Sequence, residues 1–329
     1  MALRAGLVGL GVMGRNHARV LRSLPDVQLV GVSDPAGDPN GAAAGVPVYR
    51  TVDELLECGL DMCVVATPTA THEAVGLQLA QAGVHSLIEK PVAEDAVTAR
   101  RLVAAFEAAG VLGCVGHIER YNPALQHLRA RLEVGELGDV YQVVTRRQGP
   151  FPARIADVGV IFDLATHDID LTAWVTQTTY RAVSAHTAHR SGRQAEDLVS
   201  IAGRLQDGTV VNHLVNWLSP MKERVTVVTG ERGCFVADTL TADLTYYENG
   251  TQATQWDAVA RFRGVAEGNM IRYAIPKPEP LVTELRAFAA AVRGEVADVV
   301  SLRQGLATVL VAEAVRRSAT SGENEVLAA

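Results

Sequence analysis

Two groups of side chains in this chain have types and spacings that suit removal of a hydride and a proton from an alcohol. The first is Lys90, which directly follows a predicted strand that ends at Glu89 and precedes a proline that restricts its backbone to extended geometry. An ammonium held near a carbinol oxygen can donate a hydrogen bond and ease loss of the hydroxyl proton. A single lysine is usually a surface charge. Here the neighbouring positions lead into a predicted cleft, so we expect Lys90 to take part in chemistry.

The second group is an acidic segment that contains one histidine. Asp163 and His167 are one helical turn apart, and Asp170 follows three positions later. A carboxylate one turn from an imidazole can fix its tautomer and favour its protonated form. Such a pair can accept a hydroxyl proton as a hydride leaves. Two other interpretations stay open at this point: a zinc site, which no cysteine or second histidine supports, and a solvent-facing helix end. We predict no metal.

A glycine motif near the amino terminus predicts the site of the hydride acceptor. The apolar run 5–8 has the pattern of a buried strand, and helical spacing begins after Gly14. Gly9 would permit a tight turn, Gly11 would leave room for a pyrophosphate, and Gly14 would let the helix pack closely on the strand. The helix N–H groups would then face the phosphates. We predict dinucleotide contacts at Gly9, Gly11, Val12, Met13 and Gly14.

The predicted second strand, 27–33, ends at Asp34, twenty residues beyond Gly14. A carboxylate at this position can accept hydrogen bonds from the 2′-hydroxyl of the adenosine ribose and would repel a 2′-phosphate. The nearest downstream arginine in sequence is Arg50. The pattern therefore favours NAD over NADP, with an acidic turn residue before Pro35 as the alternative.

Strands and helices alternate over residues 3–116, which is typical of a doubly wound parallel sheet. Ligands of such sheets bind beyond the carboxyl ends of the strands. We expect one crevice there, surrounded by Asp34, Thr67, Glu89, Lys90 and His117.

After Tyr121 the pattern changes to strands in succession, with Asp207-Gly208 as a hairpin signal. It predicts an α+β domain with a large, mostly antiparallel sheet. A helix is expected over 161–174, and helices return after the linker 276–280. The predicted domains are 1–118 for the Rossmann domain, 119–280 for the substrate and oligomerisation domain, and 281–329 for the carboxyl-terminal helices.

Composition excludes several classes of protein. The 329 residues are 48% hydrophobic and 20% charged with a net charge of -7, which fits a globular protein and argues against binding nucleic acid or anionic membranes. Four cysteines form no CxxC pair and are expected to be inert thiols in a reducing compartment. Because no apolar run approaches a membrane helix or the core of a signal peptide, we expect a cytoplasmic protein.

Three motifs coincide at 9–14, Glu89-Lys90-Pro91 and 159–167. Together they resemble the Gfo/Idh/MocA family of oxidoreductases. The resemblance implies NAD as cofactor and Lys90, Asp163 and His167 at the catalytic positions, with His167 as proton acceptor. It implies a homodimer or homotetramer formed through the sheet of the second domain, and carboxyl-terminal helices that pack back on the first domain. The cofactor-lining residues it implies are Thr67, Thr69, His72, Glu89 and Lys90.

Segments 116–124 and 149–159 resemble the family members that oxidise the 3-hydroxyl of nucleotide sugars such as UDP-N-acetylglucosamine. In those proteins the 3-keto product passes to an aminotransferase, so the resemblance implies a place in amino-sugar biosynthesis. Arg146, Arg147 and Arg154 could meet a diphosphate, or they could be ordinary surface arginines. The predicted substrate contacts are His117, Arg120, Tyr121, Arg154, Asp163 and His167.

Other activities stay open at this point. The chain could instead be a 3-ketosugar reductase or a dehydrogenase of free sugars or cyclitols of the inositol type. A catalytically silent, NAD-binding regulatory protein is an alternative from another class, although such a protein has no need of a proton acceptor.

Overall fold

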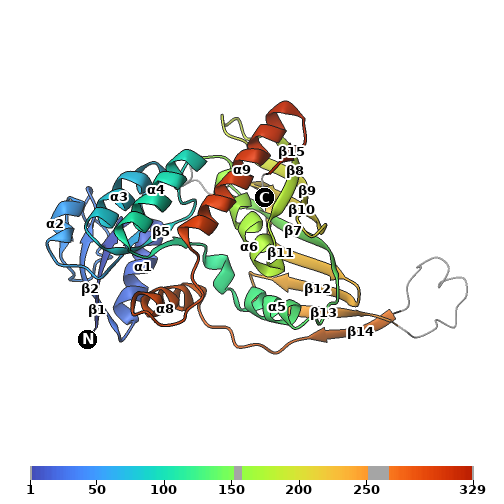
Figure 1. Ribbon diagram of the computed structural model, residues 1–329, viewed down its shortest axis with the longest axis horizontal. Helices are drawn as coiled ribbons and strands as arrows, with labels where there is room; N and C mark the ends of the chain where they lie inside the picture. Colours follow the sequence, from blue (N-terminus) through green and yellow to red (C-terminus); the bar gives the residue numbers. More distant parts are fainter. Residues whose placement is uncertain (1, 152–157, 251–266, 328–329) are drawn as a thin grey trace, which may run out of the picture. The chain divides into compact units, whose positions relative to one another are not determined.

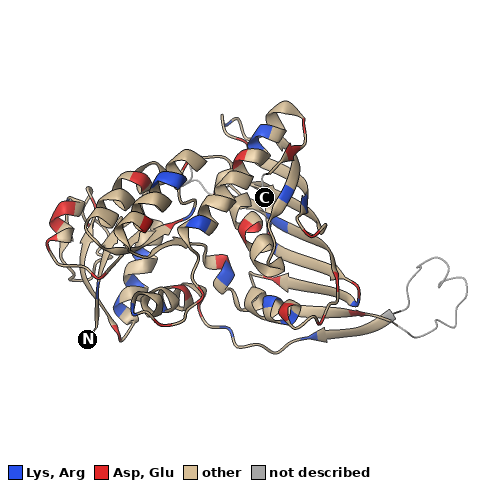
Figure 2. Ribbon diagram, in the orientation of Figure 1, with Lys and Arg blue, Asp and Glu red and all other residues tan. Residues whose placement is uncertain are grey.

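A computed structural model describes residues 2–151, 158–250 and 267–327. The chain forms two compact units, one of residues 1–118 with 279–310 and the other of residues 119–278 with 311–329 (Figure 1). The domain boundaries expected from the sequence stay a prediction. Lys and Arg are interspersed with Asp and Glu along the elements of both units (Figure 2). Among the described residues, no helix is both long and apolar enough to span a membrane.

The first unit contains six parallel strands in the order β3-β2-β1-β4-β5-β6. The order reverses at the β1–β4 pair, which is the doubly wound arrangement predicted from the sequence. The strands are β1 (Leu3–Val8), β2 (Val27–Ser33), β3 (Val48–Tyr49), β4 (Met62–Val65), β5 (His85–Glu89) and β6 (Gly113–Gly116). The helices are α1 (Val12–Ser23), α2 (Val52–Leu56), α3 (His72–Gln81), α4 (Ala96–Ala109) and α8 (Pro280–Val292).

Local sequence explains most of these boundaries. Strand β4 is buried along its whole length, as its uninterrupted apolar run predicts. Thr51 forms the capping box of α2 with Glu54, and Gly110 ends α4 in the left-handed conformation. Thr71 precedes α3, but its side chain does not cap that helix, because the hydroxyl is within hydrogen-bond distance of Thr67 Oγ1 and the Pro68 carbonyl oxygen in a preceding 3-10 turn, Thr69–Thr71.

Helix α8 completes the core of the first unit although it lies far away in sequence. Leu281, Leu285 and Phe288 are buried in the same hydrophobic cluster as Leu7 of β1 and Val32 of β2. Burying such side chains stabilises the unit by about 1.5–3 kcal/mol each. The helix α9 (Leu302–Ser321) contributes residues to both compact units.

The second unit contains a nine-stranded sheet in the order β14-β13-β12-β11-β7-β10-β9-β8-β15. Only β7 and β10 pair in parallel within it, so the mostly antiparallel sheet predicted from the sequence is confirmed. The strands are β7 (Val140–Pro150), β8 (Tyr180–Ala188), β9 (Leu198–Leu205), β10 (Val210–Asn216), β11 (Leu218–Gly230), β12 (Gly233–Asp238), β13 (Asp243–Asn249), β14 (Glu267–Arg272) and β15 (Glu325–Val326).

Two helices lie against one face of this sheet. Helix α5 (Pro123–Glu133) is capped by Asn122, has Pro123 in its first turn, and contacts β12 and β13. Helix α6 (Thr166–Thr176) contacts β7. The helix expected over 161–174 is present, but its first turn, Ile161–Ala165, is π-helical and α6 begins after it. The side chain of Thr166 donates to the Phe162 carbonyl at 2.9 Å across this junction.

Candidate functional site

The glycine loop between β1 and α1 has the geometry that its sequence predicts. Gly9 has a φ of +95°, and a Cβ at this position would lie 2.6 Å from the Ala66 carbonyl oxygen. A Cβ at Gly14 would lie 2.0 Å from the Gly9 oxygen, whereas one at Gly11 would meet nothing within 4 Å. No side chain caps α1, and its first turn carries no acidic residue. The loop therefore fits a pyrophosphate, with open space and helix N–H donors at Gly11.

Asp34 joins the end of β2 to this loop. Its Oδ2 accepts from the Leu10 N–H at 2.7 Å and its Oδ1 accepts from the Ala36 N–H at 2.8 Å. Each carboxylate oxygen can accept a second hydrogen bond, so the predicted contact with ribose hydroxyls fits this position. Arg50 is distant in sequence, yet its guanidinium donates to the Pro35 carbonyl in the turn after Asp34.

The strand end that carries Lys90 is held by a buried ion pair. Glu89 Oε1 lies 2.7 Å from His17 Nε2, and both side chains are buried. Burial raises the pKa of Glu89, but the hydrogen bond and charge of His17, with the charge of Lys90, outweigh it and leave the pKa below its usual value. Glu89 is therefore a carboxylate at neutral pH, and it fixes the position of the residue that precedes Lys90.

A second histidine fixes the residue that follows Lys90. His72 Nδ1 lies 3.0 Å from the Pro91 carbonyl oxygen, and His72 Nε2 lies 3.0 Å from the Thr67 carbonyl oxygen. Burial lowers the pKa of His72 although both hydrogen bonds oppose it. Because a neutral imidazole has one N–H, it donates to one of these carbonyls at a time. His72 thus links the segments after β4 and β5, both predicted to line the cofactor. Thr69, another predicted cofactor contact, is half-buried in the first of these segments.

In the second unit, the helix that carries the acid–base candidates begins at a carboxylate cap that sequence reasoning missed. Glu196 Oε1 accepts from the Ile161 N–H at 3.0 Å, and the Glu196 carbonyl accepts from the Val160 N–H at 3.0 Å. A Cβ at Gly159 would lie 2.0 Å from the same carboxylate oxygen, so glycine leaves room for this cap. Asp163 is 6% exposed, and His167 is half-buried in the first turn of α6.

Buried ion pairs fasten α6 to its surroundings. Arg147 of β7 donates to Asp168 at 2.8 Å and to Glu119 at 2.7 Å. Arg120 donates to both carboxylate oxygens of Asp170, at 2.8 and 2.6 Å. Removing one partner of such a buried pair typically costs about 3–5 kcal/mol. These pairs therefore hold the residues next to His167 in place.

The electrostatics of these pairs follow from their burial. Burial raises the pKa of Asp168, and the charge of Arg147 offsets only part of that rise. For Glu119 the charge of the same arginine outweighs burial, so the pKa of Glu119 lies below its usual value. Burial and the charge of Arg147 lower the pKa of Arg224, and Asp163 is among the carboxylates that oppose this shift. The sequence signal for Arg147 was its place at an inward position of β7, beside an acidic helix.

The remaining predicted residues are placed as follows. His117 and Tyr121 are buried near the end of β6, and Arg120 is occupied by Asp170 as described. Arg146 pairs with Glu223 at 2.8 Å, and Arg154 lies outside the described residues. Because Lys90 belongs to the first unit and Asp163 and His167 to the second, their meeting at one substrate stays a prediction. Among the described residues, no group of three or more His, Cys, Asp or Glu side chains could hold a metal ion.

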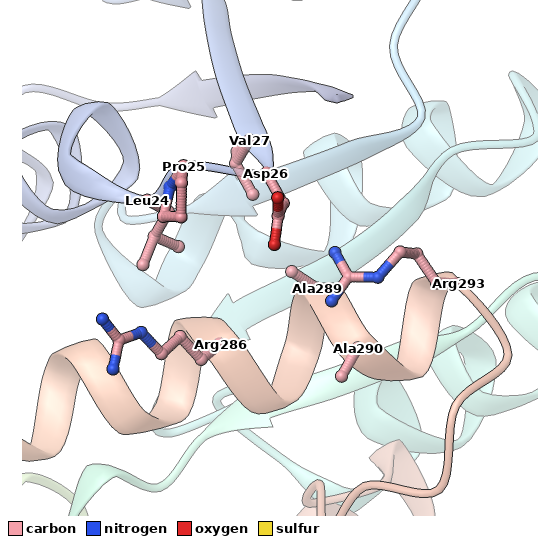
Figure 3. Close-up of a pocket in the computed structure, with 8 residues that line it drawn as sticks. All are labelled: Leu24, Pro25, Asp26, Val27, Arg286, Ala289, Ala290 and Arg293. Carbon is pink, nitrogen blue, oxygen red and sulfur yellow. The ribbon is translucent and has the colours of Figure 1, made fainter. Parts of the chain in front are cut away.

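A cavity of about 330 Å³ in the first unit lies away from this site. Leu24, Pro25, Asp26 and Val27 line one side of it, and residues of α8 line the other, with Asp26 and Arg293 pointing toward one another (Figure 3). Val27 is the first residue of β2, so the cavity is at the amino end of that strand. The glycine loop and Asp34 are at the carboxyl ends, where doubly wound folds bind ligands.

Comparison with known proteins agrees with this geometry. Residues 3–117 match the Gfo/Idh/MocA oxidoreductase family with its NAD-binding Rossmann fold, and residues 125–236 match the Gfo/Idh/MocA C-terminal domain. A UDP-N-acetylglucosamine 3-dehydrogenase from Acidithiobacillus ferrooxidans is 34% identical over 216 residues, covering 64% of this chain and 66% of that protein. The myo-inositol dehydrogenase Hyg17 from Streptomyces leeuwenhoekii is 30% identical, covering 97% of this chain and 98% of that protein.

A solved structure extends the similarity over the whole chain. The WlbA dehydrogenase from Bordetella pertussis, solved in complex with NADH and UDP-GlcNAcA, has a TM-score of 0.82 and 25% identity and covers 100% of both chains. Family match, fold and glycine-loop geometry lead to the same conclusion: this chain belongs to the Gfo/Idh/MocA family of oxidoreductases and has that family's NAD-binding Rossmann fold.

Proposed function

We propose that this chain is an NAD-dependent dehydrogenase that oxidises a secondary hydroxyl, at C3, of a nucleotide-linked sugar. The main support for this type of reaction is the position of Lys90. It follows the carboxyl end of β5, in the same sheet as the strand that leads into the glycine loop. Its two neighbours, Glu89 and Pro91, are each hydrogen-bonded to a buried histidine. The nucleotide-sugar substrate is supported by the relatives that act on or bind such sugars. A 3-keto product would suit transamination in amino-sugar biosynthesis.

In this proposal the first unit binds and orients the dinucleotide. The N–H groups at the start of α1 bind the pyrophosphate, and Asp34 accepts hydrogen bonds from the adenosine ribose. Thr67, Thr69 and His72 position the segment after β4 beside the cofactor, and Glu89 fixes Lys90. When bound, oxidised NAD supplies the acceptor for the hydride.

The proton is handled by the chain itself. Lys90 donates a hydrogen bond to the substrate oxygen, which stabilises negative charge as its proton is lost. His167 accepts that proton on a ring nitrogen, and Asp163 orients the imidazole. The carbinol C–H bond breaks with its electron pair leaving as hydride, so the products are a ketone, reduced cofactor and a protonated histidine. We propose sugar contacts at His117, Arg120, Tyr121, Arg154, Asp163 and His167.

A panel of substrates tests this proposal. Purified protein and NAD are mixed by stopped flow with UDP-N-acetylglucosamine, its uronic acid, dTDP-sugars and free inositols, and formation of NADH is followed. We expect turnover with at least one nucleotide sugar and none with free polyols. Turnover of inositols alone would favour the cyclitol dehydrogenase, for which the full-length match to Hyg17 is the specific support. Bound NAD with no turnover in either direction would favour a silent regulatory protein, and turnover only of 3-ketosugars with NADH would favour a reductase.

A further inference from the structure

The turn after Asp34 has a basic neighbour that sequence spacing does not reveal. Strands β2 and β3 pair in parallel with Ser33 opposite Tyr49, so the residues that follow both strands emerge at one edge of the sheet. The Asp34 N–H donates to the Tyr49 carbonyl at 3.0 Å. The backbone of Arg50 therefore lies beside that of Asp34, although the two residues are far apart in sequence.

The guanidinium of Arg50 lies over the turn formed by residues 35–37. The guanidinium donates to the Pro35 carbonyl. A Cβ built at Gly37 would lie 3.5–3.6 Å from three atoms of the same guanidinium. Arg50 is exposed, and the acceptor described for its guanidinium is an uncharged carbonyl. The carboxylate of Glu54 accepts from the backbone N–H of Arg50 at 2.8 Å, so it is occupied at the start of α2.

These two charges have opposite consequences for a ligand at the ribose. The Asp34 carboxylate suits neutral hydroxyl donors and repels a phosphate. A guanidinium presents several N–H donors in a planar fork that matches phosphate oxygens. With Asp34 in place, the turn selects a ribose that carries a free 2′-hydroxyl.

We propose that Arg50 and the turn 35–37 form a latent subsite for the 2′-phosphate of a phosphorylated dinucleotide, and that the charge of Asp34 weakens binding of that phosphate without abolishing the contribution of Arg50. The subsite concerns the adenosine end of the dinucleotide and does not depend on the identity of the sugar. Its failure and the failure of the proposed sugar oxidation are therefore distinguishable, because one is measured by dinucleotide binding and the other by turnover.

The test measures dissociation constants for NADH and NADPH by cofactor fluorescence, without any sugar. The variants are Asp34→Asn, Arg50→Gln and the double variant. Asn keeps one carbonyl oxygen for either the Leu10 or the Ala36 N–H and loses the other hydrogen bond. The NADH affinity of this variant therefore checks the loop geometry, and Asp34→Ser serves as a second version. We expect Asp34→Asn to bind NADPH about tenfold more tightly than the wild type does, and the double variant to lose that gain. Arg50→Gln alone should leave NADH affinity within about twofold.

A second measurement leaves Asp34 unchanged and covers the case in which its variants do not fold. In the wild type, displacement of NADH by adenosine 2′,5′-bisphosphate is compared with displacement by ADP. Arg50→Gln should weaken the first competitor more than the second. If Arg50 only shapes the turn, its loss will affect both competitors and both dinucleotides equally. An Asp34 variant that gains NADPH affinity to the same extent without Arg50 would likewise overturn the proposal.

Discussion

At the scale of single residues, Lys90 lies between two neighbours that are each held by a buried histidine. His17 holds Glu89 on one side of it, and His72 holds Pro91 on the other. Catalysis by a positioned ammonium depends on such restraint, because a misplacement of about 1 Å can cost about 10²-fold in rate. The two histidines therefore act as positioning residues in the proposed reaction.

Variants of His72 can separate its two hydrogen bonds. An Asn side chain can place its amide N–H near the position of Nδ1 and keep the bond to Pro91, whereas Gln reaches the position of Nε2 and keeps the bond to Thr67. We expect His72→Gln to lower kcat by more than His72→Asn does, because only Gln leaves the segment of Lys90 without its contact. The NADH dissociation constant should rise more in His72→Asn, which loses the bond to Thr67 in the segment proposed to lie beside the cofactor. Equal losses of kcat, or losses confined to NADH affinity, would contradict a role in positioning Lys90.

Single residues differ in how far their positions could be predicted from the sequence. The roles of Gly9, Gly11 and Gly14 were predictable, because each depends on the local path of the backbone between one strand and one helix. The contact of His17 with Glu89 was not, because it joins residues that only the tertiary fold brings together. The same holds for Arg50 beside the turn after Asp34.

At the scale of elements, α8 carries an unusual buried acid. Glu284 is fully buried, and both of its carboxylate oxygens are without a hydrogen-bond partner among the described residues. Burial, followed by the charge of Glu89, raises its pKa well above the usual value. Because the folded state then holds a proton that the unfolded state releases, stability is lost as the pH rises above the carboxyl's unfolded pKa of about 4.3.

Replacing this acid should stabilise the protein in a pH-dependent way. Glu284→Met removes the buried carboxyl at similar length, and we expect its unfolding free energy to exceed that of the wild type by at least about 1 kcal/mol at pH 8. The gain should shrink toward pH 5. Urea unfolding at several pH values measures both. A gain that does not depend on pH would show that Glu284 is not protonated through burial.

Helices and strands whose apolar residues recur at a regular spacing were predictable from the sequence. Elements without such a regular spacing were not. The succession of strands predicted after Tyr121 includes β9 (Leu198–Leu205), in which buried and exposed residues largely alternate. The π-helical turn Ile161–Ala165 was missed because one wide turn leaves too few residues to show its period. Strands β12 and β14 were also missed. The six residues of β12 lie between turns and form a strand because they pair with β11 and β13.

At the scale of the whole molecule, helices α5 and α6 lie against one face of the nine-stranded sheet, and apolar side chains of the strands are also found on the opposite face. Apolar side chains on the strands are exposed, among them Leu214 at 38%, Tyr247 at 45% and Met270 at 65%. Large apolar side chains exposed on one sheet face are typical of an interface. The homodimer or homotetramer through this sheet, implied by the family resemblance, is therefore our proposal for the assembly.

Charged substitutions on this face should change the assembly. We expect Leu214→Lys combined with Tyr247→Lys to shift the protein to a smaller species in size-exclusion chromatography with light scattering, because burying two ammonium groups opposes association. Val97→Lys, at a residue that is 59% exposed on α4, is the matched control and should leave the mass unchanged. An unchanged mass in the double variant would place the interface elsewhere.

The proposed oxidation depends most on Lys90 acting on the substrate oxygen. The direct measurement compares Lys90→Met with the wild type on the best nucleotide sugar from the panel, recording both kcat and the NADH dissociation constant. We predict that kcat falls by about 10²–10⁴-fold while NADH affinity stays within about threefold. A Lys90→Met variant that turns over the sugar at the wild-type rate would contradict the proposed chemistry.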